Sequence, residues 1–201
     1  MQNSNYIQSY LSITKGELKL NNSPTIHANN KDFKDFSKKI YTTFNISYPK
    51  FFKMDNLSKL AFLGAYILLE KHKLSNTNTA LVFANKSSSL DTDIKHQQSI
   101  SDTDNYFPSP AIFVYTLPNI CLGEIAIKFK LHTENSFFIF EEFNTDYMIK
   151  YTNHLLKANL ANHVLWAWVE ILEQEYTAHF CLVNQQTTHL EHNTETIKNI
   201  F

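Results

Sequence analysis

The chain has 201 residues, 43% of them hydrophobic, and a formal net charge of −1 at pH 7. This length and apolar content suffice for one globular domain with a substantial core. All 18 basic residues are lysines. Because the guanidinium groups that commonly read phosphates and guanine edges are missing, we expect no nucleic-acid binding.

No stretch of the sequence approaches the roughly 20 consecutive apolar residues that cross a bilayer, so we expect no membrane span. The amino-terminal residues lack the basic and apolar regions of a secretory signal, which predicts a cytoplasmic protein. The two cysteines, Cys121 and Cys181, fall within apolar patterns. They are therefore expected to be small buried hydrophobic residues and not a disulfide or a metal site.

The first part of the chain predicts one strand and one strongly patterned helix. Tyr6 to Ile13 is expected to be a strand, and the polar residues 21–24 a turn. Lys31 to Tyr41 is a short mixed helix or loop. Asp55 and Asn56 can cap a helix whose apolar residues recur at steps of three and four, which places them on one face.

The middle of the chain alternates between strand and helix patterns. Ala80 to Ala84 is a compact apolar run typical of a buried strand. The short polar side chains of Ser87 to Asp91 suit a loop that enters a helix over Thr92 to Ile100. Ser101 to Pro110 is expected to be an extended connection.

The last part predicts two helices and three strands. Pro118 starts a helix, Ser136 to Phe140 forms a strand, and Asn144 to Lys157 forms a second helix. Val164 to Leu172 and Tyr176 to Val183 are two strands separated by only three residues. That gap is too short for a parallel crossover, so the pair must be an antiparallel hairpin.

Helices that alternate with strands indicate an α/β fold with a mostly parallel sheet. We expect residues 1–183 to form the domain and residues 184–201 to be a polar, frayed tail, although Ile197, Ile200 and Phe201 can dock.

A motif precedes the strand at Ser136. It consists of a Pro-Asn turn, a glycine-containing helix with an Ile-x-Ile face, and a second asparagine. The residues that carry it are Pro118, Asn119, Gly123, Ile125, Ile127, Leu131 and Asn135. In this order and spacing they resemble the approach to the nucleophilic cysteine in β-ketoacyl-acyl carrier protein synthases (ketosynthases). Weaker resemblance at Lys50 to Ala61 and Phe83 to Asp91 extends the match over the amino-terminal half of a ketosynthase.

The resemblance implies a thiolase-like half-fold, a five-stranded mixed sheet flanked by helices. It also implies a missing thiol, because Glu141 and Glu142 occupy the place of the cysteine. A carboxylate is a poor acyl acceptor and repels a developing enolate, so we expect no condensation by this chain alone. The two histidines and the lysine of the family's other half have no counterpart here. Either glutamate can instead act as a general base if burial raises its pKa, or cap the helix that begins near Asn144.

In the family this strand lies at a sheet edge and pairs with a dimer mate. The resemblance therefore implies that the five residues of this strand form a partner interface: Ser136, Phe137, Phe138, Ile139 and Phe140. Four lysines can attract an acidic acyl carrier protein or simply be solvated. They are Lys128, Lys130, Lys150 and Lys157. No cofactor is implied beyond the phosphopantetheine that a carrier protein would bring.

Three functional hypotheses follow from the resemblance. The first is a partner, comparable to a chain length factor, that pairs with an active ketosynthase, with itself, or with a carrier protein. Its pathway would be fatty acid or polyketide assembly, with aryl polyene pigments as one option. The second is a stand-alone decarboxylase or hydrolase of acyl thioesters that uses Glu141 or Glu142. The third is a purely structural role.

Overall fold

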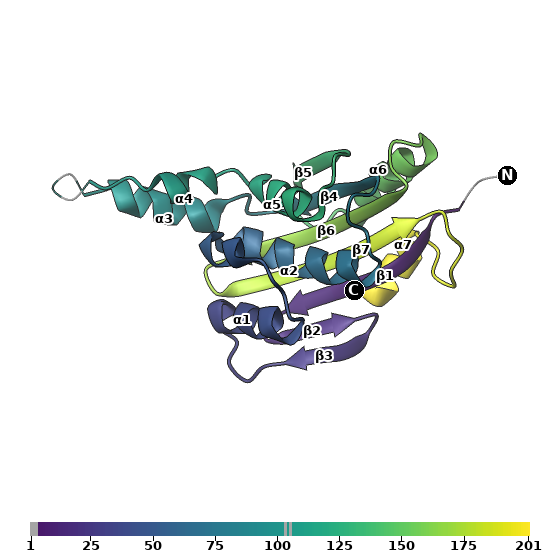
Figure 1. Ribbon diagram of the computed structural model, residues 1–201, viewed down its shortest axis with the longest axis horizontal. Coiled ribbons are helices and arrows are strands. Elements are labelled where there is room, and N and C mark those ends of the chain that lie inside the picture. The colour runs from purple at the N-terminus through teal and green to yellow at the C-terminus, as the bar shows by residue number, and fades with distance from the viewer. Residues whose placement is uncertain (1–3, 103, 105) are drawn as a thin grey trace.

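A computed structural model describes residues 4–102, 104 and 106–201. Its centre is one mixed sheet of seven strands with helices on both faces (Figure 1). The strands lie in the order β3-β2-β1-β7-β6-β4-β5. Their bounds are β1 (Tyr6–Thr14), β2 (Glu17–Leu20), β3 (Ser23–His27), β4 (Thr79–Asn85), β5 (Asn135–Ile139), β6 (His163–Leu172) and β7 (Glu175–Asn184).

The described residues form seven α-helices and one 3-10 helix. They are α1 (Phe33–Thr43), the 3-10 helix η1 (Pro49–Lys53), α2 (Asn56–Lys71), α3 (Leu90–Ile100), α4 (Pro110–Val114), α5 (Ile120–Phe129), α6 (Thr145–Lys157) and α7 (Thr194–Ile200). Helices α1, α2 and α5 pack on one face of the sheet, and α6 and α7 pack on the other. Helices α3 and α4 contact each other and project beyond the sheet (Figure 1).

The strand directions follow from the connections. Strand β4 runs parallel to both β5 and β6, and helices cross over between them, as the alternating pattern predicts. Strands β6 and β7 form the predicted antiparallel hairpin, and β1 pairs with β7 in antiparallel fashion. The mixed α/β architecture and the hairpin are thus confirmed.

The prediction of five strands is wrong, because β1 continues into two further strands. Asn21 and Asn22, expected to be only a turn, have φ angles of 50° and 61° and join β2 to β3 as a two-residue hairpin. Consecutive asparagines with positive φ are typical of hairpin turns that match the strand twist. Strand β3 gave no alternating pattern, because Ile26 is its only buried residue.

The predicted helix at residues 56–71 is confirmed, but it is buried on several sides and not only on the one face that the spacing predicts. The Asp55 side chain caps α2 by accepting a hydrogen bond from the Ser58 amide. Helix α2 packs against both the sheet and α5, and eleven of its residues are buried. This packing makes α2 the central element of the larger of the two cores.

The carboxy-terminal residues are not frayed, contrary to the prediction. The Ile7 amide donates a hydrogen bond to the Leu190 carbonyl at 2.9 Å, and Asn193 caps α7. Ile197 is buried in the core beneath α6 and α7, and the Phe201 ring lies 4.5 Å from that of His179. Docking of these apolar residues overrides the polar composition of the segment.

Candidate functional site

Glu141 and Glu142 lie in the turn that joins β5 to α6, and both side chains are exposed. The turn is held on either side of them. The Phe140 amide donates to the Asn85 carbonyl at 2.9 Å, and the Phe143 ring stacks on Trp168 at 5.5 Å. Helix α6 is capped by neither glutamate, because the Asn144 side chain accepts from the Tyr147 amide. A catalytic role for the two exposed carboxylates stays a prediction.

The two cysteines are buried and unpaired, as predicted. Cys121 faces the core from α5, and Cys181 lies in β7 under α6 and α7. Burial raises the pKa of both thiols well above the ordinary value. Because the thiolate is the reactive form, neither cysteine is suited to be a nucleophile.

Strand β5 lies at the edge of the sheet, as expected, and among the described residues it pairs only with β4. Its two central rings point to opposite cores. Phe137 packs against the α2 and α5 side, whereas Phe138 lies 5.0 Å from the Tyr147 ring on α6. Ile139, at the end of the strand, keeps 49% of its surface exposed. The outer backbone of this edge is open to pairing with another strand.

Helix α5 presents an apolar face to solvent beside this edge. Leu117 in the preceding turn and Ile127 are 58% and 66% exposed, and Ile120 is partly buried. A Cβ built at Gly123 would meet nothing within 4 Å. These residues follow helical spacing, and we name them the α5 stripe (Leu117, Ile120, Gly123, Ile127). Helix α5 contacts β5, so the stripe lies on the helix that packs against the edge strand.

The four lysines expected to attract a carrier protein do not share one surface. Lys128 extends over the rings of Tyr48 and Tyr66, with its amine 5.9 and 5.6 Å from their centroids. Lys130 ends α5 in the left-handed conformation, with φ 55°. Lys150 and Lys157 belong to α6, on the opposite side of the sheet. This second pair lines a common cavity.

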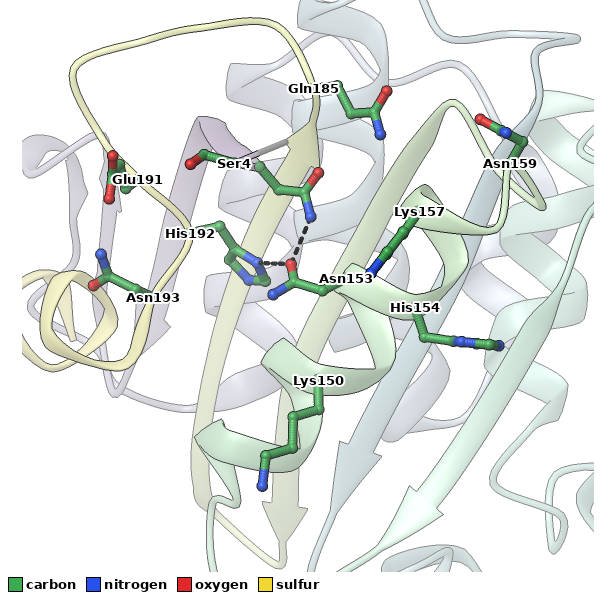
Figure 2. A pocket seen from close by; sticks show the side chains of 11 residues that line it. Ser4, Lys150, Asn153, His154, Lys157, Asn159, Gln185, Glu191, His192 and Asn193 are labelled. Carbon is green, nitrogen blue, oxygen red and sulfur yellow. Dashed lines mark hydrogen bonds between the residues drawn. The ribbon is translucent and has the colours of Figure 1, made fainter. Parts of the chain in front are cut away.

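That cavity is a polar hollow of about 790 Å³ between α6, the end of β7 and both terminal segments (Figure 2). Its lining residues are Ser4, Asn5, Lys150, Asn153, His154, Lys157, Asn159, Gln185, Glu191, His192 and Asn193. All of them are polar. We refer to this cavity as the α6 hollow.

A hydrogen-bond network fixes one wall of the α6 hollow. The Trp166 indole donates to His192 Nε2 at 2.9 Å, so the proton of the neutral imidazole sits on Nδ1. That nitrogen donates to Asn153 Oδ1 at 3.1 Å, which also accepts from Asn5 Nδ2 at 2.8 Å. Burial lowers the pKa of His192 to about 3. The sequence analysis missed His192, because no pattern in the polar residues 184–201 indicates which histidine accepts a hydrogen bond from a buried indole.

A buried carboxylate joins three segments near a smaller cavity of about 230 Å³ beside α3 and α4. Glu124 of α5 is 4% exposed, and its Oε1 lies 2.9 Å from Lys50 Nζ and 3.0 Å from the Tyr115 hydroxyl. Burial, and then the hydrogen bond to Glu124, raise the pKa of Tyr115. The cluster ties the 3-10 helix η1 and the residue after α4 to α5.

None of the described helices is both long and apolar enough to span a membrane. Within residues 4–102, 104 and 106–201, no three histidine, cysteine or acidic side chains gather where they could hold a metal ion.

No protein-family model matches the sequence, and no curated protein matches it. Solved structures do match. One is the ketosynthase ApeO in complex with its chain length factor ApeC from Xenorhabdus doucetiae, with 15% identity over 92% of this chain and 80% of that chain and a TM-score of 0.61. The ishigamide ketosynthase/chain length factor matches with 12% identity over 93% and 64% and a TM-score of 0.69.

A third match is a β-ketoacyl synthase from Burkholderia phymatum STM815, with 9% identity, a TM-score of 0.60 and coverage of 100% of this chain. The chain spans only 64% and 62% of the ishigamide and Burkholderia proteins. At such low identity the likeness shows the fold alone. The chain therefore has a ketosynthase-like fold, and its structural neighbours are ketosynthases and ketosynthase–chain length factor complexes.

Proposed function

We propose that this chain is a non-condensing, ketosynthase-like subunit that pairs through β5 and the α5 stripe with an active ketosynthase, in the manner of a chain length factor. The observation that carries the proposal is the open β5 edge beside an exposed apolar helix face. Fatty acid or polyketide assembly is the process in which such a subunit would act. Production of an aryl polyene is a finer form of the same proposal and rests on the resemblance alone.

The physical argument begins with the edge. Unpaired strand amides and carbonyls invite another strand, and proteins usually blunt them with charge, proline or a covering segment. Strand β5 carries neither a charged residue nor a proline. A partner strand added here would satisfy the outer backbone groups and continue the sheet into a second subunit.

The α5 stripe supplies the apolar area that such pairing needs. Leu117 and Ile127 stand out from the helix, whereas Gly123 leaves the surface between them flat. Because glycine has no side chain, a second helix can approach closely at this point. The apolar side chains on either side of it would then be buried from water, which favours association. Exposed apolar surfaces of this kind mark interaction sites.

The chemistry favours a partner role over a catalytic one. The resemblance assigns Glu141 and Glu142 to the place of the cysteine; both are exposed, and both thiols of the chain are buried elsewhere. An acyl carrier protein is a second proposed partner. In that case Lys150 and Lys157, both exposed on α6, would face its acidic surface.

Co-purification tests the proposal. The tagged chain is co-expressed with ketosynthases of the same organism. We expect one ketosynthase to be retained in an amount equimolar with the tagged chain. Ile127→Glu should abolish retention, because it places a charge in the apolar interface. Leu160→Glu is the matched control, since Leu160 is 52% exposed but follows α6, away from the stripe.

Light scattering on the chain alone separates the possible partners. A mass near twice 23.4 kDa would make a second copy the partner. A stable monomer at micromolar concentration that retains no ketosynthase would refute the proposal. Equal retention by Ile127→Glu and Leu160→Glu would remove the α5 stripe from the interface.

A further inference from the structure

The α6 hollow is assembled from segments far apart in the sequence. Asn5 precedes β1, Asn153 lies on α6, Gln185 follows β7 and His192 precedes α7. The bonds from His192 and Asn5 to Asn153 hold this wall in one arrangement (Figure 2). A preorganised polar wall lowers the ordering cost of binding a polar ligand.

The charge of the α6 hollow is positive. Lys150 and Lys157 stand on the same face of α6, two turns apart, against the single carboxylate of Glu191. Among the described residues no acidic group lies within ion-pair distance of either amine, whereas four other lysines have such a partner. Neutral His192 adds no charge. Two unpaired ammonium groups in one concavity attract an anion.

Hydrogen-bonding capacity is left over in the same wall. Asn153 accepts both bonds through Oδ1. The Nδ2 hydrogens of the same side chain have no acceptor among the described residues. Asn153 and Lys157 are one turn apart on α6, so their donors face the same space.

We propose that the α6 hollow binds a small phosphomonoester that carries hydroxyl groups. The phosphate oxygens would accept from Lys157 Nζ and Asn153 Nδ2, with Lys150 as the second cation, and the ligand hydroxyls would bond to the amide side chains of Gln185 and Asn193 in the lining. Charge-assisted bonds of this type are the strong ones. The volume of about 790 Å³ suits a small molecule, and the polar side chains of all the lining residues favour one with polar groups.

This proposal does not depend on the pairing with a ketosynthase, and it shares Lys150 and Lys157 with the proposed carrier-protein contact. The α6 hollow and the α5 stripe lie on opposite faces of the sheet, so each can be removed without the other. Lys157→Gln should leave retention of a ketosynthase unchanged, and Ile127→Glu should leave ligand binding unchanged.

Amide NMR titration of the full chain at constant ionic strength tests the phosphomonoester site. Three probes are used: glycerol 3-phosphate, inorganic phosphate and glycerol. We expect saturable shifts confined to residues 150–159 and 185–193, with glycerol 3-phosphate tighter than inorganic phosphate and no response to glycerol. Lys157→Gln and the isosteric Asn153→Asp should each weaken binding at least about tenfold, since each removes a donor to a charged group.

Lys128→Gln is the control, because Lys128 lies over tyrosine rings on the other face. Shifts spread over many lysines, an equal loss in Lys128→Gln, or unchanged affinity in Asn153→Asp would show only general attraction of anions and overturn the proposal. Saturation by glycerol alone would also overturn it, because the site would then recognise a neutral polyol. Spectra of each variant without ligand establish that it remains folded.

Discussion

Gly64 of α2 lies directly against the ring of Phe180 on β7, because a Cβ atom built on Gly64 would stand 2.2 Å from Cε2 of that ring. Phe180 is fully buried and meets the ring of Phe83 edge-on at 5.9 Å, so it has no room to retreat. The missing side chain is what lets the central helix approach the sheet at this point.

Gly64→Ala should therefore lower the free energy of unfolding by about 1–3 kcal/mol, as overpacking does, despite a gain of about 1 kcal/mol in helix propensity. Gly123→Ala is the matched control, since its new methyl group would meet nothing within 4 Å. It should leave the stability unchanged or raise it by up to about 1 kcal/mol. Urea denaturation measures both. Equal effects of the two substitutions would contradict the close contact of α2 with β7.

Two buried histidines should make the fold sensitive to mild acid. Burial lowers the pKa of His192 to about 3 and that of His179 to about 4, whereas the unfolded values lie near 6.5. Below pH 6.5 these histidines bind protons in the unfolded chain but stay neutral in the folded chain. The free energy of unfolding therefore falls as the pH falls. At pH 5 the loss amounts to about 2 kcal/mol per histidine relative to neutral pH.

His192→Gln, which can still accept from the Trp166 indole, should remove the contribution of His192, about 2 kcal/mol between neutral pH and pH 5. His154→Gln is the control, because His154 is exposed on α6. Urea midpoints at pH 7.5 and pH 5 provide the measurement. A pH dependence that survives unchanged in His192→Gln would mean that this imidazole is not held neutral.

The fold could be predicted where the spacing of apolar residues in the sequence matches the buried positions of a strand or helix. Strand β4 is buried along its whole length, and the short gap between β6 and β7 leaves room only for a hairpin. Strand β3 and helix α7 were not predictable. Each is held by contacts distant in sequence and shows a mostly polar composition, so local patterns say little about it.

Some features of the candidate site could likewise be predicted from the sequence, and others could not. The place of β5 at the sheet edge follows from the family resemblance, and the structure has it there. The distribution of the lysines over two faces depends on which side of the sheet each helix packs, which composition cannot tell. The role of Asn153 arises only when Asn5 and His192 meet around it, and these residues are separated by most of the chain.

The exposed glutamates provide a test of the alternative catalytic function. Glu141→Gln and Glu142→Gln should each change the free energy of unfolding by less than about 0.5 kcal/mol, as surface substitutions do. Purified chain should hydrolyse or decarboxylate malonyl and acyl thioesters of carrier protein no faster than buffer. Turnover in the natural chain that disappears in Glu142→Gln would establish the enzyme and remove the non-catalytic assignment.

The Lys50–Glu124 pair should stabilise the fold chiefly by neutralising a buried charge. Lys50→Met leaves the Glu124 carboxylate without a cationic partner, with the hydroxyls of Tyr115 and Tyr48 beside it and with Oε2 buried without a hydrogen bond. Breaking a buried pair from one side is costly, but Lys50 is half exposed, so we expect a loss of about 1–3 kcal/mol. Lys53→Met, at an exposed neighbouring position, should cost less than about 0.5 kcal/mol.

The double variant Lys50→Met with Glu124→Gln distinguishes neutralisation from simple packing. The introduced amide would be neutral and could still accept from the Tyr115 hydroxyl, so the double variant should lose less stability than the sum of the two single variants, by about 0.5–3 kcal/mol. Urea denaturation at neutral pH yields all four free energies. Strict additivity would mean that the two side chains act independently and that the 2.9 Å contact contributes nothing to folding.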